Sequence, residues 1–161
     1  MIAFIVLGRP QQRGSKQAHA RYDNSGKPIT KDGRVLTFAK DANPKSKAWM
    51  DSVRSAAVEA MGKDWEPLRC PIRLSVRFEF GRPKSHYGSG RNGDLVKASA
   101  PREHAQTPDL SKLMRAVEDG MTGIVYSDDR QICGYEECVK TWTNGVERAV
   151  IRVTPINQRG E

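Results

Sequence analysis

The segment Ile72–Phe80 constrains the fold of this chain more than any other part of the sequence. Apolar and polar residues alternate strictly along it, and the apolar positions are Ile72, Leu74, Val76, Phe78 and Phe80. Successive side chains of a β-strand point to opposite faces, so this pattern predicts a strand with one buried and one solvated face. The buried face then needs a second layer of secondary structure packed against it.

Two amphipathic helices are predicted to supply that layer. The first follows Asn43-Pro44, a pair typical of a helix N-cap and first helical position, and extends to about Met61. Its apolar face comprises Trp49, Val53, Ala56, Ala57 and Ala60. The second extends from about Leu110 to Met121, and its apolar stripe comprises Leu110, Leu113, Met114, Val117 and Met121.

Further strands are predicted toward both ends of the chain. Ile2–Leu7 is apolar on both faces, which favours a central strand, and a short strand is expected over residues 34–38. Near the C-terminus, strands over 131–143 and 147–153 flank Asn144-Gly145, a pair typical of the type I′ turn of a hairpin. The order of elements predicts a single α+β domain for the whole chain, with a mixed sheet, two main helices packed on one face and a C-terminal β-hairpin.

The charge of the chain favours a polyanionic partner. The net charge is +8, from 27 Lys and Arg against 19 Asp and Glu, and most of the excess lies in residues 1–45. A cationic surface raises the local concentration of polyanions, of which nucleic acid is the first candidate. We expect phosphate contacts from the N-terminal stretch, from a long loop between Gly81 and about Thr107, and from the second helix: Arg13, Lys16, Lys84, His86, Arg91, His104 and Lys112.

Other classes of protein are disfavoured by the sequence. It contains no run of 18 apolar residues, so neither a membrane helix nor a membrane partner is expected. The three cysteines, Cys70, Cys133 and Cys138, are odd in number and lack CxxC spacing, which argues against a disulfide framework or a zinc knuckle. No secretory signal follows Met1, so we expect a cytoplasmic protein.

Aspartates gather around the second predicted helix. Asp109 precedes it, Asp119 lies near its end, and Asp128-Asp129 follow shortly after. Carboxylate oxygens suit Mg²⁺, and a nearby Arg or Lys can stabilise charge that develops on a phosphate. The pattern fits metal-dependent phosphodiester cleavage. The alternative reading of the same residues is an N-cap, a solvated helix face and a turn.

The residues around this helix resemble a known family. Thr107-Pro108-Asp109-Leu110-Ser111-Lys112-Leu113, followed by Arg115, Asp119 and Asp128-Asp129-x-Gln131, resembles the core signature of RusA-type Holliday junction resolvases. The resemblance extends to the first strand, to the Pro- and Lys-containing stretch after it and to Arg82–Gly88, where bacterial and phage members are similar. It implies a small homodimeric, Mg²⁺-dependent endonuclease that cuts four-way and related branched DNA junctions by paired symmetric nicks.

The resemblance also assigns roles to individual residues. It implies that Asp109, Asp128 and Asp129 are catalytic, with Asp109 and Asp129 holding the metal and Asp128 supporting them. Arg115 stands where the family has an essential lysine and is expected to clamp the scissile phosphate.

Ser111 departs from the family pattern, since it stands where a second catalytic aspartate is expected. Three hypotheses therefore stay open. The first is a nuclease with one metal site per subunit. The second is a branched-DNA-binding accessory protein whose nuclease activity is weak or absent because of Ser111. The third is a basic RNA-binding domain.

Overall fold

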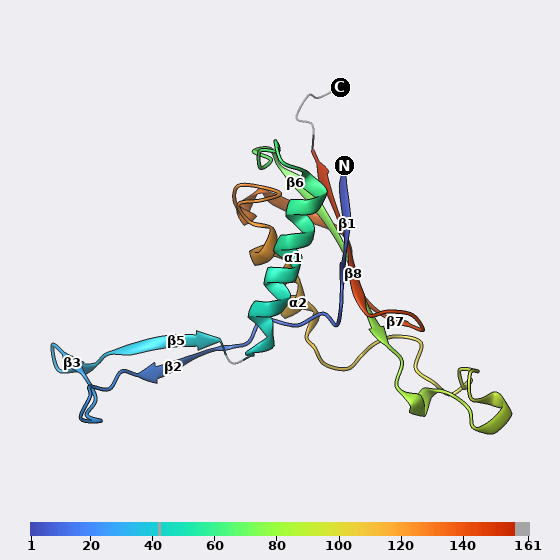
Figure 1. Ribbon diagram of the computed structural model, residues 1–161, viewed down its shortest axis with the longest axis horizontal. Helices are drawn as coiled ribbons and strands as arrows, with labels where there is room; N and C mark the ends of the chain where they lie inside the picture. Colours follow the sequence, from blue (N-terminus) through green and yellow to red (C-terminus); the bar gives the residue numbers. More distant parts are fainter. Residues whose placement is uncertain (42, 157–161) are drawn as a thin grey trace.

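A four-stranded mixed sheet forms the centre of the computed structural model, which describes residues 1–41 and 43–156. Its strand order is β1-β8-β6-β7, and β8 runs antiparallel to both neighbours while β6 and β7 run parallel. Two helices, α1 (Lys45–Met61) and α2 (Leu110–Met121), lie on the same side of this sheet (Figure 1). The predicted α+β arrangement is confirmed. The strands are β1 (Ile2–Leu7), β6 (Ile72–Gly81), β7 (Ile132–Thr143) and β8 (Arg148–Pro155).

Strand β6 supplies the centre of the core, as its alternation predicts. Its apolar side chains are no more than 1% exposed, and they pack with the buried stripes of both helices. Charged side chains cover much of the opposite face, where Arg77 pairs with Glu137 at 2.7 Å and Arg148 with Glu79 at 2.6 Å. The Arg77 guanidinium lowers the pKa of the Glu137 carboxyl.

The predicted central position of Ile2–Leu7 is wrong. Strand β1 pairs only with β8 and forms an edge of the sheet. Its inward residues Phe4 and Val6 are buried, but Ile5 and Leu7 on the other face are 48% and 68% exposed. The hydrophobic side chains on the outer face of β1 are therefore exposed, and only the inner face of this strand is buried.

The two C-terminal strands exist as predicted, but they do not form a hairpin with each other. Strand β6 lies between β7 and β8, so their connection spans two strand spacings, roughly 9–10 Å, which is too wide for a two-residue turn. The connection crosses the end of β6, where the amide of Gly81 donates to Glu147 at 3.1 Å. Neither Asn144 nor Gly145 is among the positive-φ residues that a type I′ turn requires.

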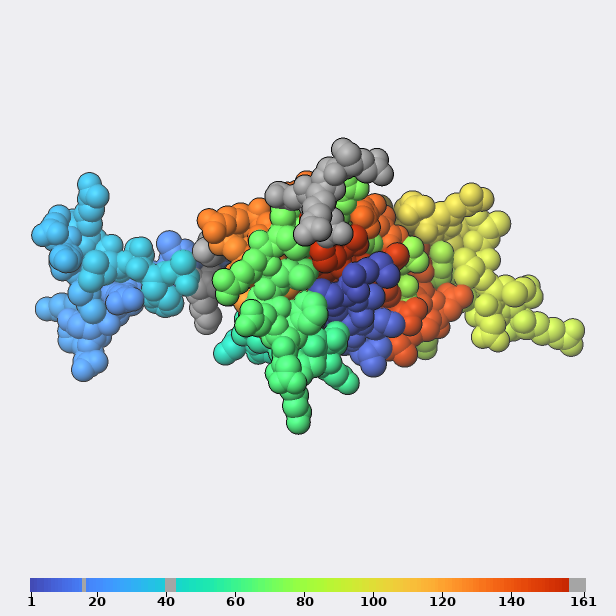
Figure 2. Space-filling model, turned by 90° about the horizontal axis from the view of Figure 1, so that it is seen from above, coloured from blue at the N-terminus to red at the C-terminus, as the bar shows by residue number. Residues whose placement is uncertain are grey.

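A β-arm projects from the body of the molecule between β1 and α1 (Figures 1 and 2). We use "arm" for residues 16–41, in which β2 (Lys16–Ala20) pairs antiparallel with β5 (Thr37–Asp41). A second small pair, β3 (Thr30–Lys31) and β4 (Arg34–Val35), lies toward its tip. Asp32 and Gly33 join this pair with φ values of 51° and 75°, the conformation of a type I′ turn. The sequence predicted only one short strand here.

The loop after β6 is anchored by a cluster of aromatic rings that pack in tilted and edge-to-face arrangements. It contains two short 3₁₀ turns, η1 (Lys84–His86) and η2 (Gly90–Asn92), and projects on the side away from the arm (Figure 2). His86 and His104 are only 8% and 5% exposed, and their rings lie 5.0 and 4.2 Å from the ring of Trp142. Both histidines are thus buried in an aromatic cluster, and little of either ring is exposed for the nucleic-acid contact that the sequence predicts.

Neither helix in the described part of the chain has the length and hydrophobicity that crossing a membrane requires.

We predict that Gly120→Ala destabilises the helix pair. A Cβ atom at Gly120 would lie 2.8 Å from Val53 Cγ1 and 3.2 Å from the Met50 carbonyl oxygen of α1. Overpacking of this kind lowers the free energy of unfolding by about 1–3 kcal/mol. Urea denaturation followed by circular dichroism measures the change. Gly134→Ala is the matched control, since its Cβ has no neighbour within 4 Å; equal stability of the two variants would contradict the prediction.

We predict that His104 makes stability pH-dependent. Burial, followed by the charges of Lys140 and Arg9, lowers the pKa of His104 below its usual 6.5. The unfolded chain then takes up the proton first, so the free energy of unfolding falls as the pH drops below 6.5. Urea denaturation between pH 7 and pH 5 should show a smaller fall for His104→Phe than for the natural protein. Parallel pH profiles would show that His104 is not responsible.

Candidate active site

The N-terminus of α2 holds Asp109 with a fixed backbone and an exposed carboxylate. Its carbonyl accepts a hydrogen bond from the amide of Leu113, and its amide donates to the side-chain oxygen of Gln12. Lys140 of β7 donates to the Pro108 carbonyl at 2.8 Å, next to this cap. The Asp109 side chain is 54% exposed and pairs with Lys112 at 3.1 Å. This carboxylate is therefore accessible to a cation or a substrate.

Arg13 ties the base of the arm to α2. Its amide donates to the Lys112 carbonyl at 3.0 Å, and its guanidinium lies 2.9 Å from the Asp119 carboxylate. Gln12, one residue earlier, contacts the Asp109 amide. The structure thus gives Arg13 an anchoring partner where the sequence predicted a phosphate contact, and it gives Asp119 the role of holding that arginine.

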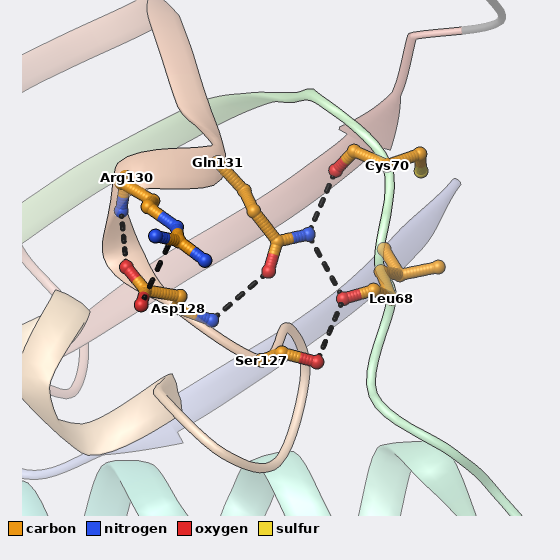
Figure 3. A network of polar contacts seen from close by, with 6 residues as sticks. All are labelled: Leu68, Cys70, Ser127, Asp128, Arg130 and Gln131. Carbon is orange, nitrogen blue, oxygen red and sulfur yellow. Dashed lines mark hydrogen bonds and ion pairs between the residues drawn. The ribbon is translucent and has the colours of Figure 1, made fainter.

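Asp128 and Asp129 form a second acidic group, at the start of the 3₁₀ turn η3 (Asp129–Gln131), which precedes β7. Figure 3 shows the contacts of Asp128 in this turn. Asp128 accepts from the amide of Arg130 at 3.0 Å, and its own amide donates to Gln131 at 2.9 Å. The Gln131 side chain also donates to the carbonyls of Leu68 and Cys70. Asp128 and Gln131 therefore fix the turn. The Asp129 carboxylate is exposed and has no hydrogen-bond or ion-pair partner among the described residues, whereas the backbone carbonyl of Asp129 accepts from the amide of Ile132.

Glu118 of α2 adds a carboxylate to this region that the sequence interpretation missed. It accepts a hydrogen bond from the Tyr135 hydroxyl at 2.6 Å. Burial, this hydrogen bond and the charge of Glu118 raise the pKa of Tyr135 to about 12, and the charge of Asp129 contributes as well. Burial and the charges of Glu118 and Asp129 also raise the pKa of Tyr126. The spacing of Ser111, Arg115 and Glu118 at i, i+4 and i+7 was the available signal.

The two acidic groups lie at opposite ends of α2. Asp109 precedes the first residue of α2, beside the segment that Lys140 of β7 contacts, whereas Asp129 precedes the first residue of β7, at the other end of that strand from Lys140. A helix of 12 residues is about 18 Å long, far beyond the reach of ligands to one ion. A separation of this size does not favour one metal ion held by Asp109 and Asp129 of the same chain. Among the described residues, no three His, Cys, Asp or Glu side chains gather into a metal-binding group.

A groove of about 500 Å³ runs between α2 and the edge strand β7. Ser111 and Arg115 are both exposed and line it from the outer face of the helix. Lys112 and Asp119 do not line this groove with Arg115. Lys112 pairs with Asp109 instead, and Asp119 pairs with Arg13. The other lining residues are Leu110, Met114, Glu118, Tyr135 and Cys138.

The remaining predicted nucleic-acid contacts lie apart from this groove. Lys84 and Arg91 are exposed on the projecting loop, so both are free to meet a large anionic ligand. Lys112 is half-buried beside Asp109. The side chain of Lys16 lies outside the described part of the structure.

A comparison of the sequence with protein-family models gives a match over most of the chain. A model of the endodeoxyribonuclease RusA matches residues 16–154, a range that includes the arm, the projecting loop, α2 and both acidic groups. No curated protein matches the chain. Because the match covers most of its 161 residues, the chain belongs to the RusA endodeoxyribonuclease family.

Proposed function

We propose that this protein is a Mg²⁺-dependent endonuclease that nicks four-way or related branched DNA junctions by symmetric phosphodiester hydrolysis. The observation that carries the proposal is that the exposed carboxylates of Asp109 and Asp129 precede α2 and β7, the two elements between which the groove with Arg115 lies. Their oxygens are suitable ligands for Mg²⁺, and the guanidinium is a suitable partner for a phosphate.

The separation of the carboxylates makes a second copy of the chain part of this proposal. In a homodimer with its two-fold axis across the middle of α2, the two copies of the helix run antiparallel. Asp109 of one protomer then lies beside the partner subunit's Asp129, and each dimer contains two equivalent sites. The apolar part of the groove, which includes Leu110 and the exposed Tyr135, is a suitable contact surface for the second copy.

Each residue has a distinct task in the proposed site. Asp109 and Asp129 hold the metal, and Asp128 supports the second of them by fixing its turn. Bound Mg²⁺ supplies positive charge that polarises the phosphate and favours ionisation of a water molecule. Arg115 binds the scissile phosphate and orients it between the two carboxylates. Lys84 and Arg91 hold the flanking duplex through phosphate contacts, which carry no sequence information.

We predict that two inactive variants restore each other's activity. Asp109→Asn and Asp129→Asn should each lower Mg²⁺-dependent cleavage of a labelled four-way junction by more than about 100-fold, because each removes a direct metal ligand. When the variants are co-expressed, a mixed dimer keeps one site with both natural carboxylates. About a quarter of the natural number of sites then returns, because about half the dimers are mixed.

The negative control is Asp109→Asn co-expressed with the double variant Asp109→Asn/Asp129→Asn, which leaves no complete site in any dimer. Failure of the first mixture to cut, although the natural protein cuts, would mean that each site is built from a single chain. Failure of the natural protein to cut any branched DNA would overturn the nuclease proposal itself.

We predict that Ser111→Asp lowers the Mg²⁺ concentration needed for half-maximal junction cleavage several-fold. Ser111 is exposed two residues after Asp109, so an added carboxylate raises the negative charge of the same ligand set. Ser55→Asp, an exposed position on α1, adds the same charge away from the groove and should leave the Mg²⁺ dependence unchanged. An unchanged requirement in Ser111→Asp would show that this position does not face the metal.

A further inference from the structure

The arm carries apolar side chains that nothing in its own structure covers. Tyr22 and Phe38 are 61% and 43% exposed, although both lie on a two-stranded element that projects from the body (Figure 2). A two-stranded sheet has no core of its own and is only marginally stable in water. Exposed aromatic side chains on such an element indicate a binding surface.

These aromatic residues border one open pocket of about 680 Å³. His19 of β2 and Phe38 of β5 are direct cross-strand neighbours, and their ring centroids lie 5.5 Å apart with the planes inclined by 30°. Tyr22 lies just beyond the end of β2, where it pairs with Pro28. Ala18, Ala20, Arg21 and Ile29 complete the lining, and the two alanines leave room beside the rings.

The positive charge of the arm favours an anionic ligand. Residues 16–41 contain six Lys or Arg against three Asp. One of these carboxylates, that of Asp23, is held within a turn by the amides of Ser25 and Lys27 at 2.8 and 2.9 Å. A cationic surface around an aromatic pocket favours an anionic partner and disfavours a second copy of the same cationic arm.

We propose that this pocket binds a nucleobase that leaves its pair where the duplexes meet at the branch point of DNA, with the base stacked on Phe38 and Tyr22 and its phosphate beside Arg21. Every base has an aromatic face, so stacking accepts any sequence, whereas bases inside a regular duplex are already stacked and inaccessible. The pocket thus selects a branch point over uninterrupted duplex. This inference rests on the proposed function and names the feature of the substrate that the arm recognises.

Photochemical crosslinking tests the contact directly. A four-way junction with 5-iododeoxyuridine at the branch point is irradiated with the full-length protein in Ca²⁺, and the attached peptide is identified by mass spectrometry. We expect attachment within residues 17–39, at Phe38 or Tyr22. Phe38→Ala should remove most of it and weaken junction binding about tenfold, with binding of a fully paired duplex unchanged.

Val35→Ala is the matched control, since Val35 is exposed on the same arm but does not line the pocket. It should crosslink and bind like the natural protein. Attachment only outside the arm, in a protein that still prefers and cuts junctions, would overturn this inference and leave the proposed function intact. A Phe38→Ala variant that loses its dimeric mass in light scattering would show that the arm binds a second copy and would also overturn it. A natural protein without preference for junctions would overturn both proposals.

Discussion

The packing of α2 against α1 and the sheet is the constraint on which the rest of the structure depends. The helix buries one stripe of side chains completely, and its glycine at position 120 lies in close contact with Val53 of α1. Its rotation about its own axis is therefore fixed. Because side chains follow a 100° step, this rotation also determines that Ser111 and Arg115 face the groove beside β7. The face of the helix that lines the groove is thus determined by burial of its other face.

The acidic pair shows how one turn gives two adjacent identical residues different roles. Asp128 satisfies backbone donors of its own turn, and Gln131 completes the same network by bonding to two carbonyls of the segment before β6. Asp129 takes no part in this network. Because the contacts of Asp128 and Gln131 fix the turn, the Asp129 carboxylate is not needed to stabilise the fold and stays available to bind a ligand.

Local periodicity predicted the elements well because it reports burial. The alternation over β6 and the stripe over α2 gave nearly the observed bounds of both elements. The same reasoning failed on relations between elements. Strands β7 and β8 are consecutive in the chain but separated by β6 in the sheet, and a turn-like dipeptide at 144–145 does not reveal an intervening strand. Likewise, histidine in a polar loop suggests exposure, whereas His104 is buried against Trp142.

The candidate site could be predicted as a set of residues but not as a geometry. The motif places Asp109 and Asp129 on either side of one helix, and a helix of this length keeps its two ends about 18 Å apart. That distance follows from the sequence once the helix is accepted, and it is the reason why the proposed metal site takes its two carboxylates from two chains. In the proposed dimer each copy also contributes one arm and one projecting loop. The arm and the loop project on opposite sides of each chain, so such a dimer has four projections with which to contact DNA that extends beyond its two sites.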